Sequence, residues 1–251
     1  MNMYRTGSIF STVRCMKILF SHEVARKKLG GFRPLLFFPL VIVARVLGFP
    51  PKINRQSAAI QTFVLNKLTE TRFKNFLEFG AGYGRMALSL CKETRACGIC
   101  VDADGRDINT LNQLARKLAL DCDGIAGDIL QCKFEKDSFD LIYGIEVMEH
   151  IKEDRKLLEL IHHWLKKDGT FIFQTPYHFK QMPDQTDHKF GHVRNRYSEQ
   201  TFEQVNNGLF DFEYYALGKR EKCEWCLYGM DKVHPLKLVG VGRKSKVIMK
   251  V

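Results

Sequence analysis

From residue 73 onward, short apolar runs alternate with amphipathic segments of helical period, and this alternation restricts the fold more than any other feature. The apolar runs predict strands, and the segments between them predict helices that connect one strand to the next. The expected strands are 74–79, 96–102, 123–129, 139–145, 169–176, 210–218 and 237–244, and the expected helices are 85–93, 105–119, 154–166 and 197–207. This order predicts an α/β fold with a doubly wound, mainly parallel, seven-stranded sheet.

The chain of 251 residues is long enough for one such domain and an extension. The segment PPKINRQ at 50–56 indicates a linker, because two prolines end any preceding helix. Residues 57–70 follow it with apolar side chains at helical spacing. We therefore expect a basic, apolar N-terminal extension at 1–56 and one domain at 57–251.

The net charge of +11 is concentrated at the two ends of the chain. Residues 1–70 carry 11 Lys and Arg against 2 Asp and Glu, residues 71–212 carry 19 against 22, and residues 213–251 carry 9 against 4. Basic ends fit an anionic partner such as lipid head groups, nucleic acid or a phosphorylated substrate. A solvated basic surface would have the same composition.

The longest apolar stretch, LLFFPLVIVARVLGFP at 35–50, is short for a membrane span and is interrupted by Pro39 and Arg45. Two interpretations of it stay open. It can lie on a membrane surface as a peripheral contact, or it can cover the acceptor pocket of the domain as a lid.

The eight cysteines are scattered through apolar segments and lack the spacing of a secreted disulfide scaffold. This pattern favours a reducing compartment. We therefore predict a cytoplasmic protein, with membrane-peripheral association if residues 35–50 make that contact.

The stretch FLEFGAGYGR at 76–85 has three glycines at every second position, directly after the first expected strand. Open α/β sheets bind ligands beyond the carboxyl ends of their strands, and glycine lets the backbone approach a nucleotide closely. The dinucleotide fingerprint GxGxxG would need a third glycine where this chain has Arg85. Glu78, just before the loop, would repel a pyrophosphate and suits a ligand with an amino group.

The pattern E-x-G-x-G-x-G resembles the first motif of class I S-adenosylmethionine-dependent methyltransferases. VDAD at 101–104, GDIL at 127–130, FDLIYGIEVMEHI at 139–151 and LKKDGTFIFQTP at 165–176 resemble later motifs of that family, in the same order. The resemblance covers about residues 57–243. It implies a Rossmann-like methyltransferase fold with S-adenosyl-L-methionine as the cofactor.

The resemblance also implies which residues bind the cofactor. Glu78 would accept from the amino group of the donor or lie one layer behind it. Asp102 would bind both ribose hydroxyls, Asp128 would meet the adenine amine, and Ile145 would pack on the adenine. The implied cofactor-binding residues are Glu78, Gly80, Ala81, Gly82, Asp102, Ala103, Asp128, Ile129 and Ile145.

The segment IEVMEHI has Glu146, Glu149 and His150 at i, i+3 and i+4, so one helical turn would gather them on one face. The same E-x-x-E-H arrangement occurs in ubiquinone-biosynthesis O-methyltransferases, where it is associated with a divalent cation. By this resemblance the three residues would be metal ligands. In the alternative interpretation, both glutamates stabilise the next helix by interacting with the positive end of its dipole at the N-terminus. We expect no obligatory metal, and we take His150 as the candidate catalytic base.

Further polar residues follow the fifth expected strand. His178, His188 and His192 belong to a long insertion there, and Arg194, Arg196 and Tyr197 can bind an anionic or hydroxylated acceptor. The ordinary polarity of a surface loop is an equally good interpretation.

Together these features predict a methyltransferase that methylates an oxygen of a small-molecule, lipid-linked or glycan-linked acceptor. A nucleic-acid methyltransferase would suit the basic ends, but adenine-N6 enzymes carry an Asn/Asp-Pro-Pro-aromatic motif where this chain has IEVME. A non-catalytic nucleotide-binding module is disfavoured by the intact glycine loop and the two acids, Asp102 and Asp128. A nicotinamide-dependent oxidoreductase is disfavoured by Arg85 in the fingerprint.

Overall fold

The computed structural model describes residues 73–177, 197–219, 225–229 and 237–245. Within these ranges, eight strands form one sheet in the order β3-β2-β1-β4-β5-β8-β6-β7. The strands are β1 (Asn75–Phe79), β2 (Cys97–Asp102), β3 (Cys122–Ala126), β4 (Phe139–Ile145), β5 (Leu165–Pro176), β6 (Phe210–Lys219), β7 (Trp225–Gly229) and β8 (Lys237–Lys244). The α-helices are α4 (Arg85–Thr94), α5 (Gly105–Leu118), α6 (Asp154–Trp164) and α7 (Glu199–Asn206), and the 3-10 helices are η1 (Ile129–Gln131) and η2 (Met148–His150).

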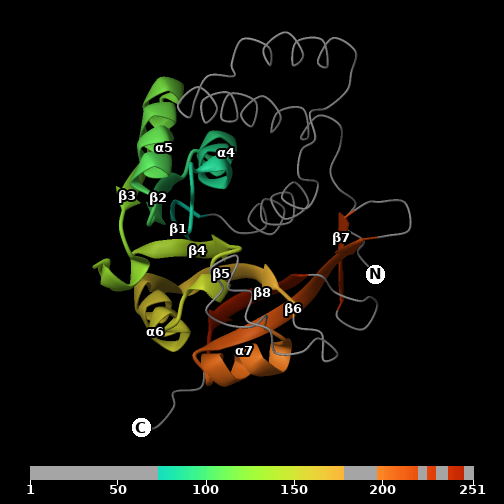
Figure 1. Cartoon of the computed structure of the whole chain (residues 1–251). Helices are drawn as coiled ribbons and strands as arrows, with labels where there is room; N and C mark the ends of the chain where they lie inside the picture. The colour runs from blue at the N-terminus through green and yellow to red at the C-terminus, as the bar shows by residue number, and fades with distance from the viewer. Residues whose placement is uncertain (1–72, 178–196, 220–224, 230–236, 246–251) are drawn as a thin grey trace.

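The first five strands are parallel, and the direction changes only toward one side of the sheet. β1 to β5 pair in parallel, β8 is antiparallel to both β5 and β6, and β7 is antiparallel to β6. Figure 1 shows α4 and α5 on one side of the sheet and α6 and α7 on the other. The carboxyl ends of the five parallel strands therefore share one edge, where sheets of this kind bind ligands.

The helix boundaries follow local chemistry. Asp104 precedes α5, and its side chain accepts a hydrogen bond from the backbone N–H of Arg106. Ser198 precedes α7 and forms a capping box with Thr201. The N-cap of α4 is Gly84, which has no side chain to cap the helix, so that helix needs an acceptor from elsewhere in the fold.

The structure confirms the predicted fold class, with two differences of detail. β7 adds an antiparallel strand beyond β6 that the sequence pattern did not indicate. β5 begins at Leu165 instead of 169, because the side chain of Leu165 is fully buried and Lys166 pairs with Asp140 of β4 at 2.7 Å. The β4–β5 register shifts after Phe139, so the KKDG segment at 166–169 forms a bulge.

Several expectations fall outside the described residues. These are the helix at 57–70, the boundary between 56 and 57, the apolar run at 35–50 and the insertion with His178, His188, His192, Arg194 and Arg196.

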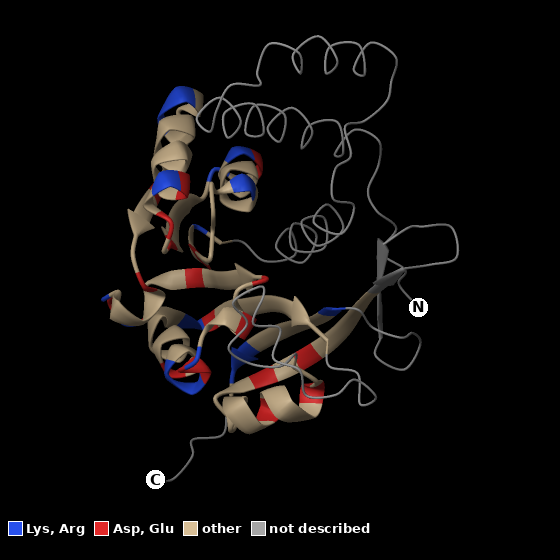
Figure 2. Cartoon of the chain, in the orientation of Figure 1, with Lys and Arg blue, Asp and Glu red and all other residues tan. Residues whose placement is uncertain are grey.

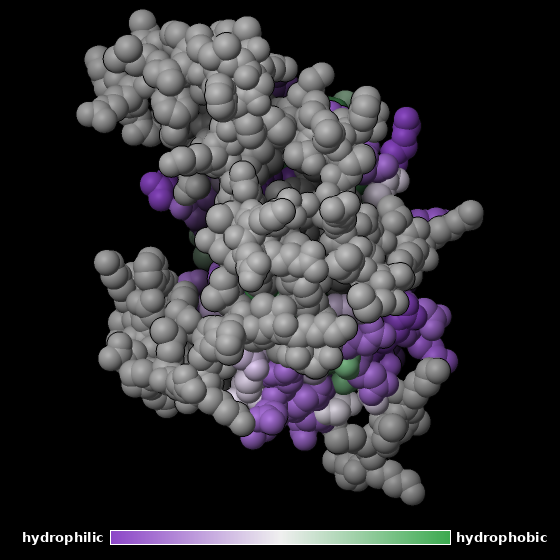
Figure 3. All heavy atoms as spheres, turned by 90° about the vertical axis from the view of Figure 1, so that its right-hand side faces the viewer, coloured by the Kyte–Doolittle hydropathy of each residue, from purple (hydrophilic) through white to green (hydrophobic). Residues whose placement is uncertain are grey.

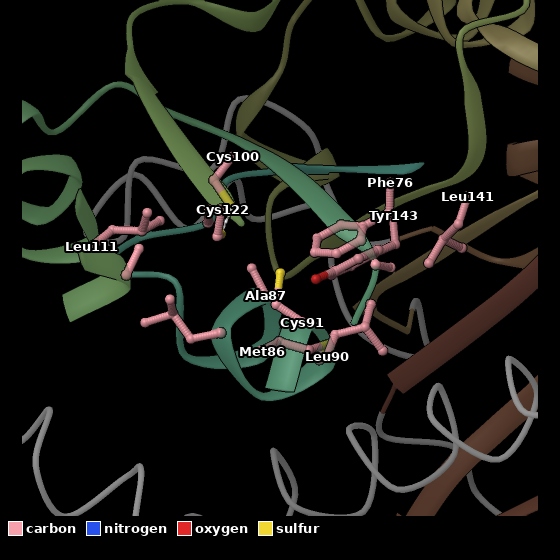
Figure 4. Close-up of a cluster of buried hydrophobic side chains, with 14 of the residues drawn as sticks. Phe76, Met86, Ala87, Leu90, Cys91, Cys100, Leu111, Cys122, Leu141 and Tyr143 are labelled. Atoms are coloured by element: carbon pink, nitrogen blue, oxygen red, sulfur yellow. Dashed lines mark hydrogen bonds between the residues drawn. The ribbon is translucent and has the colours of Figure 1, made fainter. Parts of the chain in front are cut away.

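Two apolar clusters fill the two faces of the sheet. The cluster under α4 and α5 includes Phe76, Leu111 and Tyr143, and Figure 4 shows these side chains together with residues of α4. The cluster under α6 and α7 is rich in aromatic rings, with Phe173 stacked on Phe202 at a centroid distance of 3.9 Å. Burying side chains of this size stabilises a fold by roughly 1.5–3 kcal/mol each, so the clusters fix the sheet against its helices.

The surface of the described part is mixed in charge and largely polar. Figure 2 shows Lys and Arg at both ends of α4 and α5, with Asp and Glu interspersed among the other elements. The described surface seen in Figure 3 is mainly hydrophilic. No helix in the described ranges has the length and hydropathy needed to cross a bilayer.

Gly144 of β4 lies against the ring of Phe79, and a Cβ at this position would come within 2.3 Å of ring atoms. We expect Gly144→Ala to destabilise the protein by about 1–3 kcal/mol, because neither central strand can move away. Gly127→Ala is the control, since a Cβ there would meet nothing within 4 Å. Urea denaturation of both variants measures the difference, and equal midpoints would contradict this account of the β1–β4 packing.

Candidate active site

The glycine loop and the end of β2 are joined by backbone and carboxylate hydrogen bonds. The N–H groups of Gly80 and Ala81 both donate to the carbonyl of Val101, at 2.8 and 3.2 Å. The N–H of Gly82 donates to Oδ2 of Asp102 at 2.7 Å, while Oδ1 accepts from the N–H of Asp104 at 2.8 Å. The carboxylate of Asp102 is therefore held in one orientation at the carboxyl end of its strand.

Of the three glycines in the loop, only Gly82 would accept a Cβ without a close contact. Gly80 has φ 67°, and a Cβ on it would lie 2.6 Å from the side chain of Val147, which follows β4. Gly84 has φ 72°, and a Cβ on it would lie 2.4 Å from the side chain of Leu111 in α5. At Gly82, with φ 52°, the nearest contact of a Cβ would be Asp107 at 3.6 Å. The outer two glycines thus allow close packing, and Gly82 leaves room above the loop.

Glu78 lies beneath the loop, inside the core. Its side chain is buried, and its Oε2 accepts from the N–H of Ala87 and from the hydroxyl of Tyr143, both at 3.0 Å. Ala87 is the third residue of α4, so Glu78 provides the capping acceptor that Gly84 cannot. Figure 4 shows the Tyr143 hydroxyl directed toward α4. Burial raises the pKa of Glu78 to about 8.

The other predicted cofactor residues lie along the same edge of the sheet, with differing exposure. Asp128 is exposed, and its Oδ1 accepts from the N–H of Leu130, so it caps η1. Ala103 is exposed just after β2, and Ile145 is partly buried at the end of β4. The side chain of Ile129 is buried in the core under α6, so only its backbone remains for contact with a ligand.

The E-x-x-E-H residues do not share a helical turn, contrary to our prediction. Glu149 and His150 lie in η2, whereas Glu146 precedes it with φ 56°, a left-handed conformation that is rare outside glycine. The backbone N–H of Glu146 donates to the carbonyl of Gln174 in β5 at 2.8 Å. His150 is exposed, whereas Glu149 next to it is buried, so the two side chains lie in different surroundings.

Both carboxylates of this segment have partners that the sequence did not indicate. Glu146 accepts from the side-chain amide of Gln174 and, at 2.5 Å, from the ammonium of Lys237 in β8. Glu149 is 1% exposed; its Oε2 accepts from the hydroxyl of Thr175 at 3.2 Å, and its Oε1 has no partner among the described residues. Burial, and then the charge of Glu146, raise the pKa of Glu149 to about 7.

This arrangement does not fit a divalent cation. Both oxygens of Glu146 already accept from donors, and the pKa of Glu149, raised to about 7, leaves that carboxyl only partly ionised at neutral pH. In the described part of the chain, no three His, Cys, Asp or Glu side chains converge as a ligand set. A hard divalent ion needs several ionised or carbonyl oxygens directed at one point.

The sequence suggested that Tyr197 can bind the acceptor molecule, but in the structure its hydroxyl is not available for that contact. Its side chain is 2% exposed, and the hydroxyl donates to Asp154 of α6 at 2.7 Å. Tyr197 therefore joins the start of α6 to the segment before α7.

Comparison with known proteins identifies related sequences. A family model described as a methyltransferase domain matches residues 52–215. A sterol 24-C-methyltransferase of Debaryomyces hansenii is 29% identical over 120 residues, which are 47% of this chain and 32% of that protein. N-methyltransferase 4 of Papaver somniferum is 30% identical over 105 residues, which are 40% of this chain and 29% of that protein. The matched part thus spans about a third of the length of these curated relatives.

Solved structures share the fold. An S-adenosylmethionine-dependent methyltransferase from Clostridium acetobutylicum superposes with a TM-score of 0.59 at 14% identity, covering 81% of this chain and 96% of the other. The YcgJ protein from Bacillus subtilis superposes with a TM-score of 0.58 at 17% identity, covering 74% and 99%. At these identities the likeness concerns the fold alone.

The buried carboxyl of Glu78 gives a prediction about stability and pH. Its pKa is about 8 in the folded protein against 4.5 for the ordinary group, so its contribution to stability is fully present below pH 4.5 and is lost as the pH rises to about 8. Glu78→Gln keeps an oxygen acceptor and cannot ionise. We expect this variant to lose less stability between these pH values, by a margin on the order of a few kcal/mol.

Chemical denaturation at several pH values between 5 and about 8.5 measures this difference. Glu93→Gln is the matched control, because Glu93 is exposed on α4. If Glu78→Gln and Glu93→Gln follow the wild-type pH profile alike, Glu78 is not a buried neutral carboxyl.

Proposed function

The chain belongs to the methyltransferase domain family, and on this premise we propose that it transfers the methyl group of S-adenosylmethionine to a small-molecule, lipid-linked or glycan-linked acceptor. The glycine loop joined to Asp102 is the observation that carries the proposal. The match covers only about a third of the length of the curated relatives. The activity of the relatives is therefore not carried over as a whole, and the activity of this chain is a proposal.

The geometry of Asp102 supports its proposed contact with the ribose. Each carboxylate oxygen accepts one backbone N–H, from Gly82 and from Asp104, and a carboxylate oxygen has a second acceptor position. Two neighbouring hydroxyls of a ribose can donate to these remaining positions. Because the carboxylate is oriented in advance, little side-chain freedom is lost when the donor binds.

The remaining donor contacts follow from the same edge of the sheet. Asp128 follows Gly127, whose N–H donates to the carbonyl of Asp102 at 2.9 Å, so the proposed adenine contact lies next to the proposed ribose contact. Ile145 offers an apolar side chain for the adenine ring. The backbone at Gly82 suits the amino-acid tail of the donor, and Gly80, Ala81, Ala103 and the backbone of Ile129 are proposed as further cofactor-binding groups. Glu78 is proposed to support the glycine loop from inside the core and not to contact the donor, because its carboxyl already accepts hydrogen bonds from α4 and Tyr143.

The proposed reaction is an in-line displacement in which an acceptor oxygen bonds to the methyl carbon while the carbon–sulfur bond breaks. The products are the methylated acceptor and S-adenosylhomocysteine, and the acceptor proton passes to a base. Alignment of the two reactants and exclusion of water are the main tasks of the protein. One curated relative is named for C-methylation of sterols and the other for N-methylation, and the sterol name supports a lipid acceptor.

We propose His150 as the group that accepts this proton. Its imidazole is exposed at the end of η2, beyond the carboxyl end of β4. Histidine is the side chain that most often performs this role near neutral pH. No obligatory metal is proposed, and a nucleic-acid acceptor is disfavoured by the segment IEVME after β4.

Two proposals concern the N-terminal part of the chain. The family match begins at residue 52, close to the proposed boundary between an extension at 1–56 and a domain at 57–251. The apolar run at 35–50 is proposed either as a lid over the acceptor or as a peripheral membrane contact of a cytoplasmic protein.

Replacing Asp102 tests the proposed donor site. Asp102→Ala is expected to weaken the binding of S-adenosylhomocysteine by roughly 2–4 kcal/mol, because two hydrogen bonds to a charged acceptor are lost. Isothermal titration calorimetry measures the effect, with the exposed residue change Asp123→Ala on β3 as the control. Equal affinity of Asp102→Ala and wild type would contradict the assignment.

Transfer of label tests the activity itself. The purified protein is incubated with S-adenosylmethionine tritiated in its methyl group and with lipid, glycan and small-molecule fractions, and the labelled product is identified. We expect label in one acceptor fraction with wild-type protein and a large loss of label with Asp102→Ala. A protein that binds the donor but labels none of these fractions would favour the non-catalytic module, and label in nucleic acid would contradict the acceptor class.

A further inference from the structure

The face of α5 that packs against the glycine loop carries a carboxylate. Asp107 and Leu111 are four residues apart in α5, so their side chains lie on one face of the helix. Leu111 lies against Gly84, and a Cβ on Gly82 would lie 3.6 Å from Oδ2 of Asp107. The carboxylate of Asp107 therefore borders the loop at the residue whose N–H donates to Asp102.

The nearest cation in α5 is directed at a different acid. The guanidinium of Arg106 donates from Nε to Oδ1 of Asp104 at 3.2 Å and from Nη2 to Oδ2 at 3.0 Å. The hydrogen bond to Asp104 is the main cause of the raised pKa of Arg106, and the charge of Asp107 contributes least. Asp107 is half-buried, and within the part of the chain that the structure describes its carboxylate accepts no hydrogen bond and forms no ion pair. Its negative charge is therefore available to a ligand that lies over Gly82.

The proposed donor and its product differ in charge at one atom. S-adenosylmethionine carries a sulfonium, and S-adenosylhomocysteine has a neutral sulfide in its place. Both molecules also carry the ammonium and the carboxylate of the amino-acid tail, whose charges cancel to a first approximation. A fixed negative charge close to the ligand therefore stabilises the bound donor and has little effect on the bound product.

We propose that Asp107 is a specificity-determining residue that favours the cationic donor over the neutral product. This inference rests on the proposed function and deepens it, because it requires the donor to lie over Gly82. In the proposed reaction the acceptor oxygen bonds to the methyl carbon, the electron pair of the carbon–sulfur bond stays on sulfur, and the acceptor proton passes to the base. The sulfur loses its positive charge at that step, so Asp107 attracts the product less than the donor.

Isothermal titration calorimetry of the full-length protein, with S-adenosylmethionine and with S-adenosylhomocysteine, tests the inference. Asp107→Asn keeps the shape of the side chain and removes its charge. We expect this variant to bind the donor on the order of five-fold more weakly and to change its affinity for the product by less than about two-fold. Asp107→Glu retains the charge and should keep most of the wild-type preference for the donor. Asp123→Asn is the matched control, because Asp123 is exposed on β3.

The ratio of the two dissociation constants separates this role from a structural one. Asp107 lies in the first turn of α5, where an acid also stabilises the helix through its dipole. Loss of that stabilisation alone would weaken the binding of donor and product alike and would leave their ratio unchanged. Asp107→Ser is a second neutral variant, made so that a folding failure of Asp107→Asn leaves another to decide. A neutral variant that is folded by circular dichroism and keeps the wild-type ratio would overturn the inference.

The affinity ratio requires neither an acceptor nor turnover. A protein whose ratio changes as expected, but that labels no acceptor, would contradict the proposed function and leave the role of Asp107 standing. A protein that labels an acceptor and keeps its ratio after loss of the charge would contradict the role of Asp107 alone. Failure of the wild-type protein to bind either ligand would contradict both.

Discussion

The parallel pairing of β1 with β2 is the constraint on which the candidate site depends. It sets the glycine loop against the end of β2, where the carbonyl of Val101 accepts from two successive N–H groups of the loop and Asp102 accepts from a third. A shift of this register by one residue would turn Glu78 from the α4 face of the sheet to the α6 face and would separate the loop from Asp102. The buried side chains of Phe76 and Leu77 on the two faces of β1 prevent that shift.

Two buried carboxyls serve different purposes in the fold. Glu78 satisfies a helix N-terminus that begins with glycine, so the chain keeps its open loop without leaving the first turn of α4 uncapped. Glu149 lies at the ends of β4 and β5 with one oxygen lacking a partner in the described part of the chain, which is an arrangement more typical of a functional position than of a structural one. The left-handed backbone at Glu146 belongs to the same region, where strain often accompanies function.

The sequence predicted the order of elements because the apolar period changes wherever a strand gives way to a helix. The family resemblance implied that Gly82 and Asp102 bind one cofactor, and the structure brings them into contact at the carboxyl ends of β1 and β2. The sequence could not predict β7, a strand of only five residues, or the pairing of Lys237 with Glu146. That contact depends on β8 lying beside β5, and no local pattern reports it. The prediction of a helical turn that includes Glu146 was wrong. The backbone N–H of Glu146 donates to the carbonyl of Gln174 in β5, so this residue continues the strand pairing and does not enter a helix.

The position of β8 has a consequence for how the molecule is made. β8 is the last strand among the described residues, yet it lies between β5 and β6, which precede it. During synthesis, which proceeds from the N-terminus, β5 and β6 must wait with unpaired edges until the residues up to Lys244 have emerged from the ribosome. Contacts so distant in sequence form slowly. The ion pair beyond the ends of β4 and β5 is therefore assembled last, after the glycine loop and the end of β2 have been able to meet.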